Sequence, residues 1–128
     1  MTNLILVSCS DDMVSQCTKI ILITQAIAKE SKTNRQTEDL QKTLHMADSF
    51  DKAADKMRNL SISDDDLVKY KSEFADIYQG YARTTRQFIS ALQEKDINTI
   101  KLMQHQLQQL GKKEQKMGNR MNNYCKAK

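Results

Sequence analysis

Apolar residues recur at steps of three and four along most of the chain, which is the spacing that lines one face of an α-helix. Three short polar breaks, at residues 31–34, 61–63 and 95–96, interrupt this pattern. The breaks divide the chain into four segments of helical character. The first is expected over residues 11–30 and the second over residues 37–59, while the third and fourth begin near positions 63 and 96.

The last two segments carry the most regular pattern, with steps of three and four residues in strict alternation. A repeat of about 3.5 residues favours nearly antiparallel helices with a slight left-handed supercoil. Short connections make successive helices antiparallel neighbours. The chain is therefore predicted to be all-α, an antiparallel up-down-up-down four-helix bundle, with a three-helix bundle and a detached N-terminal segment as the alternative. The alternating positions are Leu67, Tyr70, Phe74, Ile77, Tyr81, Thr84, Phe88 and Ala91, then Ile100, Met103, Leu107, Leu110, Glu114, Met117, Met121 and Tyr124.

Polar residues at the predicted helix ends indicate where the helices begin. Ser10 or Asp11 is expected to cap the first helix, because a short side-chain oxygen accepts a hydrogen bond from a backbone N–H that has no partner within the helix. Ser63 is expected to cap the third helix, with Asp66 at the capping-box position. Asp96 is expected to cap the fourth helix.

Length and composition fit one helical domain. The 128 residues include three Gly and no Pro, which argues against an all-β fold with many tight turns. No apolar run approaches the ~20 residues that a membrane-spanning helix needs. We expect a single bundle domain over residues 10–128, preceded by a short segment at residues 1–9.

The net charge of +4 is concentrated in the C-terminal quarter of the chain. Residues 96–128 carry a net charge of +5, whereas residues 1–95 carry −1. A basic face suggests an acidic partner such as an anionic lipid, a nucleic acid or an acidic protein surface. The alternative is a solvated face whose cations lie near the negative end of the helix dipole. The basic surface is formed by Lys112, Lys113, Lys116 and Arg120.

Glu114 is the one charged residue within the apolar pattern of the fourth helix. In an antiparallel pair, Tyr78 and Tyr81 lie opposite it, so the three are predicted to form a buried polar site. The alternative is a long side chain that reaches solvent at the edge of the seam. One acid without a second acid or a histidine supports neither acid–base catalysis nor metal binding. His45 and His105 lack the Glu-x-x-His spacing of di-iron bundles.

A short motif near the N-terminus suggests export and lipidation. Leu6-Val7-Ser8-Cys9 follows an apolar stretch and precedes polar residues, and it resembles the lipobox of bacterial lipoproteins. The overall layout also resembles small helical lipoproteins of a cyanobacterial kind. The resemblance implies that Cys9 is lipidated and that residues 1–9 are a signal or anchor segment. The alternative is an ordinary apolar N-terminus that packs on the bundle.

The other two cysteines fall at opposite ends of the chain. In an up-down-up-down bundle the start of the first helix and the end of the fourth are neighbours. We therefore predict a disulfide between Cys17 and Cys125, with two reduced buried thiols in the cytosol as the alternative. Closing a loop of this size stabilises the fold by ~4–5 kcal/mol in the chain-entropy model.

These observations predict a non-catalytic bundle anchored on the periplasmic side of the cell envelope. It would act as a protein-interaction or accessory subunit at a membrane surface, through an unknown protein partner. No catalytic residue, metal site, cofactor, nucleic-acid partner or small-molecule substrate is indicated. The alternative is a cytosolic adaptor or oligomerising bundle with free thiols.

Overall fold

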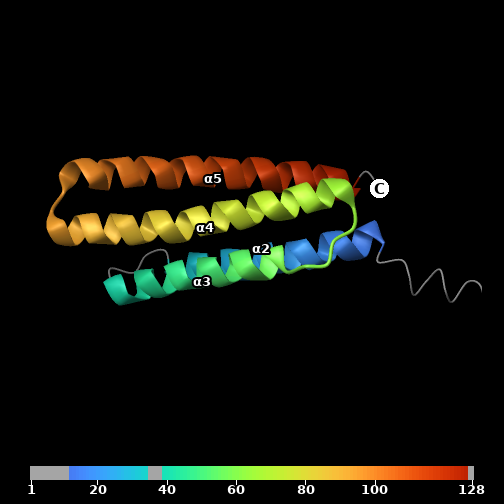
Figure 1. The fold of residues 1–128 in the computed structure, drawn as a ribbon, viewed down its shortest axis with the longest axis horizontal. Coiled ribbons are helices and arrows are strands. Elements are labelled where there is room, and N and C mark those ends of the chain that lie inside the picture. Colours follow the sequence, from blue (N-terminus) through green and yellow to red (C-terminus); the bar gives the residue numbers. More distant parts are fainter. Residues whose placement is uncertain (1–11, 35–38, 127–128) are drawn as a thin grey trace, which may run out of the picture.

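The computed structural model describes residues 12–34 and 39–126, and these ranges contain four α-helices and no strand. The helices run alternately in opposite directions along one long axis (Figure 1). The predicted antiparallel up-down-up-down four-helix bundle is therefore confirmed. The four helices are α2 (Met13–Asn34), α3 (Leu40–Arg58), α4 (Asp65–Glu94) and α5 (Ile97–Lys126).

The capping residue of α4 differs from the prediction. The Asp64 carboxylate accepts a hydrogen bond from the backbone N–H of Leu67, at 3.0 Å, so Asp64 and not Ser63 is the cap. The Ser63 hydroxyl instead accepts a hydrogen bond from the side chain of Gln16. Because the cap is one residue later than predicted, Asp66 does not hold the capping-box position.

Of the other two predicted caps, that of α5 is confirmed, whereas a different residue caps α2. Asp96 caps α5, since its carboxylate accepts from the backbone N–H of Thr99 at 3.2 Å. At the start of α2, Asp12 accepts from the backbone N–H of Ser15 at 2.8 Å and therefore serves as the cap. The predicted caps Ser10 and Asp11 lie outside the described residues. The α2 helix also continues through the polar residues 31–34, where a break was expected.

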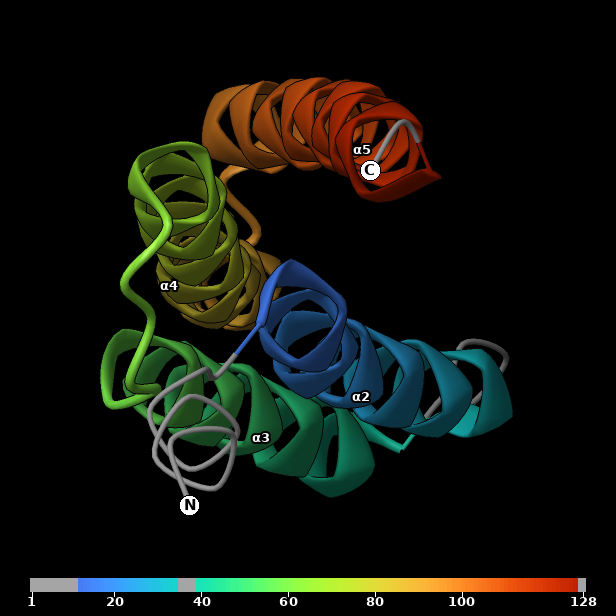
Figure 2. The same ribbon diagram turned by 90° about the vertical axis from the view of Figure 1, so that its right-hand side faces the viewer.

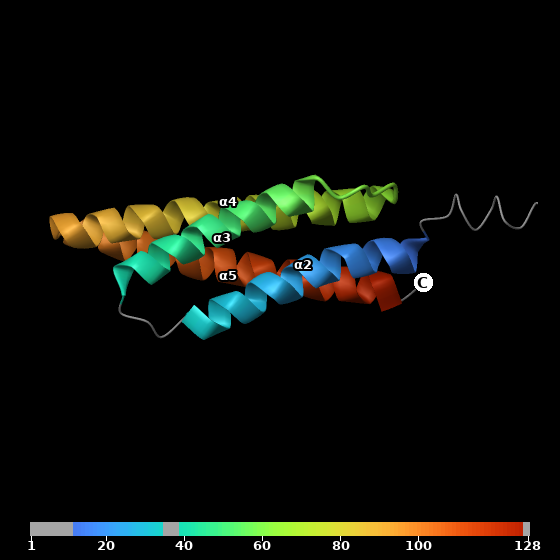
Figure 3. The ribbon, with the colours of Figure 1, turned by 90° about the horizontal axis from the view of Figure 1, so that it is seen from below.

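The helices do not enclose the core evenly. α4 packs against both α3 and α5, and α2 packs mainly against α3. Viewed end-on, α5 lies beside α4 and away from α3 (Figure 2). α2 and α5 lie side by side near the start of α2 and separate toward the far end (Figure 3). The bundle is therefore closed between α2 and α5 at one end and open along the rest of that edge.

The buried side chains reflect this uneven packing. Ile20, Met57, Leu67 and Tyr78 are the largest fully buried side chains, and they come from α2, α3 and α4. The buried residues of α5 are methionines, whose unbranched side chains adapt to irregular gaps. α5 thus buries fewer side chains than α3 and α4 do. The three methionines are Met103, Met117 and Met121.

Gln16 connects the start of α2 to the loop between α3 and α4. Its side chain is only 3% exposed. Its amide oxygen accepts hydrogen bonds from the backbone N–H groups of Ser63 and Asp64, at 2.9 Å and 3.0 Å. Its amide nitrogen donates to the Ser63 hydroxyl at 3.1 Å. One buried side chain therefore satisfies backbone groups at the N-terminus of α4 that the helix itself leaves without partners.

We predict that replacing Gln16 with Leu destabilises the fold. The substitution keeps a similar volume but removes the acceptor of two part-buried backbone N–H groups, those of Ser63 and Asp64, which costs about 1–3 kcal/mol. Urea denaturation measures the loss. Gln25→Leu, at an exposed position of the same helix, is the control and is expected to stay within about 0.5 kcal/mol of the parent protein. Equal stability of the two variants would contradict this role for Gln16.

Candidate functional site

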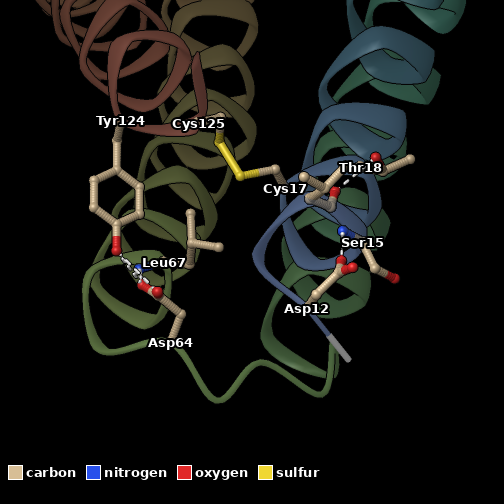
Figure 4. Close-up of a disulfide and its surroundings, with 9 residues drawn as sticks. Asp12, Ser15, Cys17, Thr18, Asp64, Leu67, Tyr124 and Cys125 are labelled. Atoms are coloured by element: carbon tan, nitrogen blue, oxygen red, sulfur yellow. Dashed lines mark hydrogen bonds between the residues drawn. A yellow bond between two sulfur atoms is a disulfide. The ribbon is translucent and has the colours of Figure 1, made fainter. Parts of the chain in front are cut away.

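A disulfide joins the start of α2 to the end of α5. The Sγ atoms of Cys17 and Cys125 are bonded, and their Cα atoms lie 6.3 Å apart across a sequence separation of 108 residues (Figure 4). The predicted pairing is confirmed. α2 and α5 share few other contacts. The disulfide therefore closes the bundle where side-chain packing alone holds it weakly.

A second connection lies beside the disulfide. The hydroxyl of Tyr124 donates to the carboxylate of Asp64, with oxygen–oxygen distances of 2.9 Å and 2.8 Å (Figure 4). The ring of Tyr124 also meets the ring of Tyr70 edge to face, with centroids 5.9 Å apart. Because Asp64 also caps α4, a single carboxylate links the end of α5 to the start of α4. This hydrogen bond, more than burial, raises the pKa of Tyr124 to about 12.

The predicted polar site at Glu114 lies along the open edge of the bundle. The hydroxyl of Tyr81 donates to Glu114 Oε1 at 2.9 Å. The two residues line a cavity of about 260 Å³ that also includes Phe50 of α3 and part of α2. The structure thus brings Glu114 and Tyr81 together across α4 and α5. Their hydrogen bond holds the carboxylate at the cavity wall.

Tyr78 belongs to the core beneath this site. Its side chain is fully buried, and its ring packs near those of Phe50 and Phe74, with centroids 6.0 Å and 6.2 Å away. Its hydroxyl has no hydrogen-bond partner among the described residues. Burial and the negative charge of Glu114 both raise the pKa of Tyr78, so its hydroxyl stays neutral. Tyr78 therefore senses the charge of the Glu114 carboxylate, but no hydrogen bond joins the two residues.

Among the described residues that line the cavity, Glu114 is the one with a carboxylate. Within residues 12–34 and 39–126, no group of three or more histidine, cysteine or acidic side chains is arranged to hold a metal ion. His45 and His105 are both exposed on helix surfaces. A carboxylate beside aromatic rings can bind a cation or a hydrogen-bond donor.

The basic surface is exposed, but acidic side chains lie nearer to it than the sequence suggests. Lys113, Lys116 and Arg120 line a groove between α4 and α5. The carboxylates of Glu73 and Asp76 lie on the α4 side of the same groove. Opposite charges across a groove lower the local positive potential. Sequence analysis missed these acids, because their position depends on how α4 faces α5.

Lys112 lies on another part of α5, in a shallow surface hollow that it shares with Lys113 and Lys116. The side chains that line this hollow are lysines and uncharged Gln and Asn residues, with no acidic residue among those described. The outward side of α5 is therefore its most positive part.

Arg86 has a structural role that sequence analysis did not identify. Its guanidinium contacts the carboxylates of Asp48 and Asp51 of α3, each at 2.7 Å. These ion pairs raise the pKa of Arg86 and join the far halves of α3 and α4. The spacing of three residues between the two acids, one helical turn, is the signal that could have indicated a shared partner.

Cys9 and the rest of the lipobox-like segment lie outside the described residues. Within the described part of the chain, none of the helices is long and apolar enough to cross a lipid bilayer. Comparison of the chain with known protein families, with curated proteins and with solved structures gives no match.

The Tyr124–Asp64 hydrogen bond predicts a stability change at alkaline pH. The folded protein raises the pKa of Tyr124 from 10.0 to about 12, so the bond stabilises the fold fully below pH 10 and is lost as the pH rises toward 12. The unfolding free energy of the parent protein should therefore exceed that of Tyr124→Phe by a constant amount between neutral pH and pH 10. The difference should shrink above that value.

Chemical denaturation over a series of pH values, with tyrosinate absorbance recorded in parallel, measures both effects. Tyr70→Phe is the control, because it removes a hydroxyl from the same ring pair without touching Asp64. A Tyr124 that ionises together with the tyrosines of the unfolded chain would contradict the prediction.

Proposed function

We propose that this protein is a non-catalytic helical bundle of the cell envelope, held at a membrane surface, where it serves as a protein-interaction or accessory subunit. The observation that carries the proposal is the Cys17–Cys125 disulfide. Disulfides form and persist in oxidising compartments such as the periplasm, and they are rare in the cytosol. The pairing of these two cysteines therefore supports an exported protein.

The same end of the bundle supports membrane attachment. The disulfide places the start of α2 beside the end of α5 (Figure 4). Cys9 is three residues before Asp12, so a lipid attached to Cys9 would be within a few residues of this end of the bundle. Pairing of the other two cysteines leaves Cys9 as the one thiol available for modification. This arrangement agrees with the lipobox-like sequence before it.

The basic side of α5 supplies a second contact with an anionic surface. Lys112, Lys116 and Arg120 recur at steps of four residues, so they follow one side of the helix. Arg120 is about 8 Å and Lys112 about 20 Å from Cys125 along the helix axis. All three reach a flat membrane together only if α5 lies along it. Each basic residue near an anionic leaflet contributes about 1 kcal/mol.

Mass spectrometry of the protein isolated from its native membranes tests the location. Free thiols are alkylated under denaturing conditions before reduction, and the peptides are then identified. We expect linked peptides of Cys17 and Cys125 and an acylated Cys9 at the amino terminus. Three alkylated cysteines on an unmodified chain would favour the cytosolic adaptor and overturn the proposal. A disulfide-bonded protein with an unmodified Cys9 would support the oxidising compartment but contradict the lipid anchor.

Sedimentation of the non-lipidated protein with vesicles of anionic phospholipid tests the basic surface. Reversing Lys112, Lys116 and Arg120 to Glu is expected to weaken binding by about a hundredfold or more, since three contributions of about 1 kcal/mol are lost. The matched control reverses three exposed lysines of the other helices, Lys29, Lys42 and Lys69, and changes the net charge equally. An equal loss in both variants would assign binding to net charge rather than to α5.

A further inference from the structure

α2 is the most apolar of the four described helices, and it lies at the margin of the bundle. It packs mainly against α3 and shares few contacts with α4 and α5, so part of its surface faces outward (Figure 2). Its apolar residues are also spread more evenly around the helix than those of α3, α4 and α5. A helix that is apolar on all sides is normally covered on all sides. The outward side of α2 is therefore a place where a covering partner is expected.

Exposed side chains at steps of four residues form a continuous outer face on α2. Val14 and Leu22 are 63% and 60% exposed, among the highest values for large apolar residues in the described part of the chain. Thr18 lies between them in the sequence, Ala26 follows Leu22 by one helical turn, and both are also exposed. These four residues are called the outer α2 face. A step of four residues places them on one inclined ridge, of the kind that packs into a groove of another helix.

The outer α2 face can be buried without leaving a polar group unpaired. The hydroxyl of Thr18 already donates to the backbone carbonyl of Val14 at 2.8 Å. Between Val14 and Ala28 the one charged residue is Lys19, which is half-buried rather than exposed. Burial of an unpaired hydroxyl or charge would oppose association. The four residues of this face require neither.

A groove between α2 and α3 lies beside this face. Its volume is about 250 Å³, and Leu22 and Ala26 line it together with residues of α3. Because Ala26 is small, the side chain of a partner can lie next to Leu22 at this point. The lining also includes Glu30 of α2 and Lys52 and Lys56 of α3, so charges of both signs are present. The groove therefore does not select a partner of one charge.

The charges of α2 favour a second copy of the same chain as that partner. Its exposed charges lie near the two ends of the helix and differ in sign, with Asp12 at the start and Lys29 and Lys32 near the end. Two parallel α2 helices would bring like charges together. An antiparallel pair places Asp12 of each copy at the same end as Lys29 and Lys32 of the other, which is favourable. It also pairs the two helix dipoles in opposite directions.

We propose that two copies of this chain associate through the outer α2 face as an antiparallel two-fold dimer. A two-fold interface uses the same patch on both copies, and the uncharged middle of this face allows it to meet itself. Leu22 lies near the middle of α2, so the symmetry axis passes close to it. Leu22 of each copy then contacts Leu22 and Ala26 of the other.

This arrangement leaves the basic side of α5 free and does not depend on where the protein resides in the cell. The two Cys17–Cys125 ends lie at opposite ends of the dimer, because the α2 helices run in opposite directions. Both ends reach one membrane only if the helices lie along it, which the basic side of α5 also requires.

Sedimentation equilibrium of the non-lipidated, disulfide-bonded full chain, at concentrations from about 1 μM to about 1 mM, tests the proposal. We expect the average mass of the parent protein to rise with concentration toward twice that of the monomer. Leu22→Glu is expected to weaken dimerisation by about a hundredfold or more, because it buries two like charges at the axis. Leu102→Glu is the matched control, since Leu102 is a 52% exposed leucine of α5, and it should dimerise like the parent.

A mixture of two variants tests the position of the symmetry axis. Leu22→Glu and Leu22→Lys are each expected to be monomeric, because each brings two like charges together. In an equimolar mixture the opposite charges meet across the axis, and we expect the dimer to form at least about tenfold more tightly than in either variant alone. Mixing Leu102→Glu with Leu102→Lys should have no such effect.

Circular dichroism and urea denaturation at low concentration verify that each variant folds. A parent protein that stays monomeric over the whole concentration range would overturn the proposal, whatever else covers the outer α2 face. An equal loss of dimer in Leu22→Glu and Leu102→Glu would overturn it as well. Failure of the mixed Leu22 variants to associate would contradict the antiparallel pairing about Leu22.

Discussion

The covalent connection between α2 and α5 is the constraint on which the architecture depends. These two helices share few contacts beyond the end where Cys17 meets Cys125. The chain-entropy model assigns a disulfide across a loop of this size about 4–5 kcal/mol, because the bond restricts the unfolded chain. That amount is comparable to the total stability of a marginal domain. The disulfide thus supplies a connection between α2 and α5 that their side-chain packing does not.

Two further contacts at the same end reinforce this connection. Gln16 binds the loop before α4, and Tyr124 donates to Asp64, the cap of α4. The start of α2, the start of α4 and the end of α5 are therefore joined within a small region. The far end relies on side-chain packing and on the ion pairs of Arg86 with α3. The disulfide and these side-chain hydrogen bonds therefore gather where the start of α2 meets the end of α5.

The open edge of the bundle follows from this unequal distribution. α2 and α5 are fixed at one end and separate toward the other, which leaves a cavity beside Glu114 and Tyr81. The methionines of α5 fit an uneven seam because their side chains adapt to its shape. The outer side of α5 carries lysines and an arginine, while the side toward the cavity carries a carboxylate. One helix therefore carries side chains of opposite charge on two of its sides.

The sequence alone determined the helices and their order, because the three-and-four spacing of apolar residues is a local property of each segment. It also indicated the Cys17–Cys125 pair and the proximity of Glu114 to Tyr81, since short connections force successive helices to run antiparallel. The hydrogen bond of Tyr124 to Asp64, the binding of Gln16 to the loop and the acids opposite Lys113 were decided by the tertiary structure. Each depends on the rotation and separation of helices that are distant in the chain, and no periodic pattern within one helix specifies those quantities. The cavity has the same origin, because it exists only where two packed helices separate.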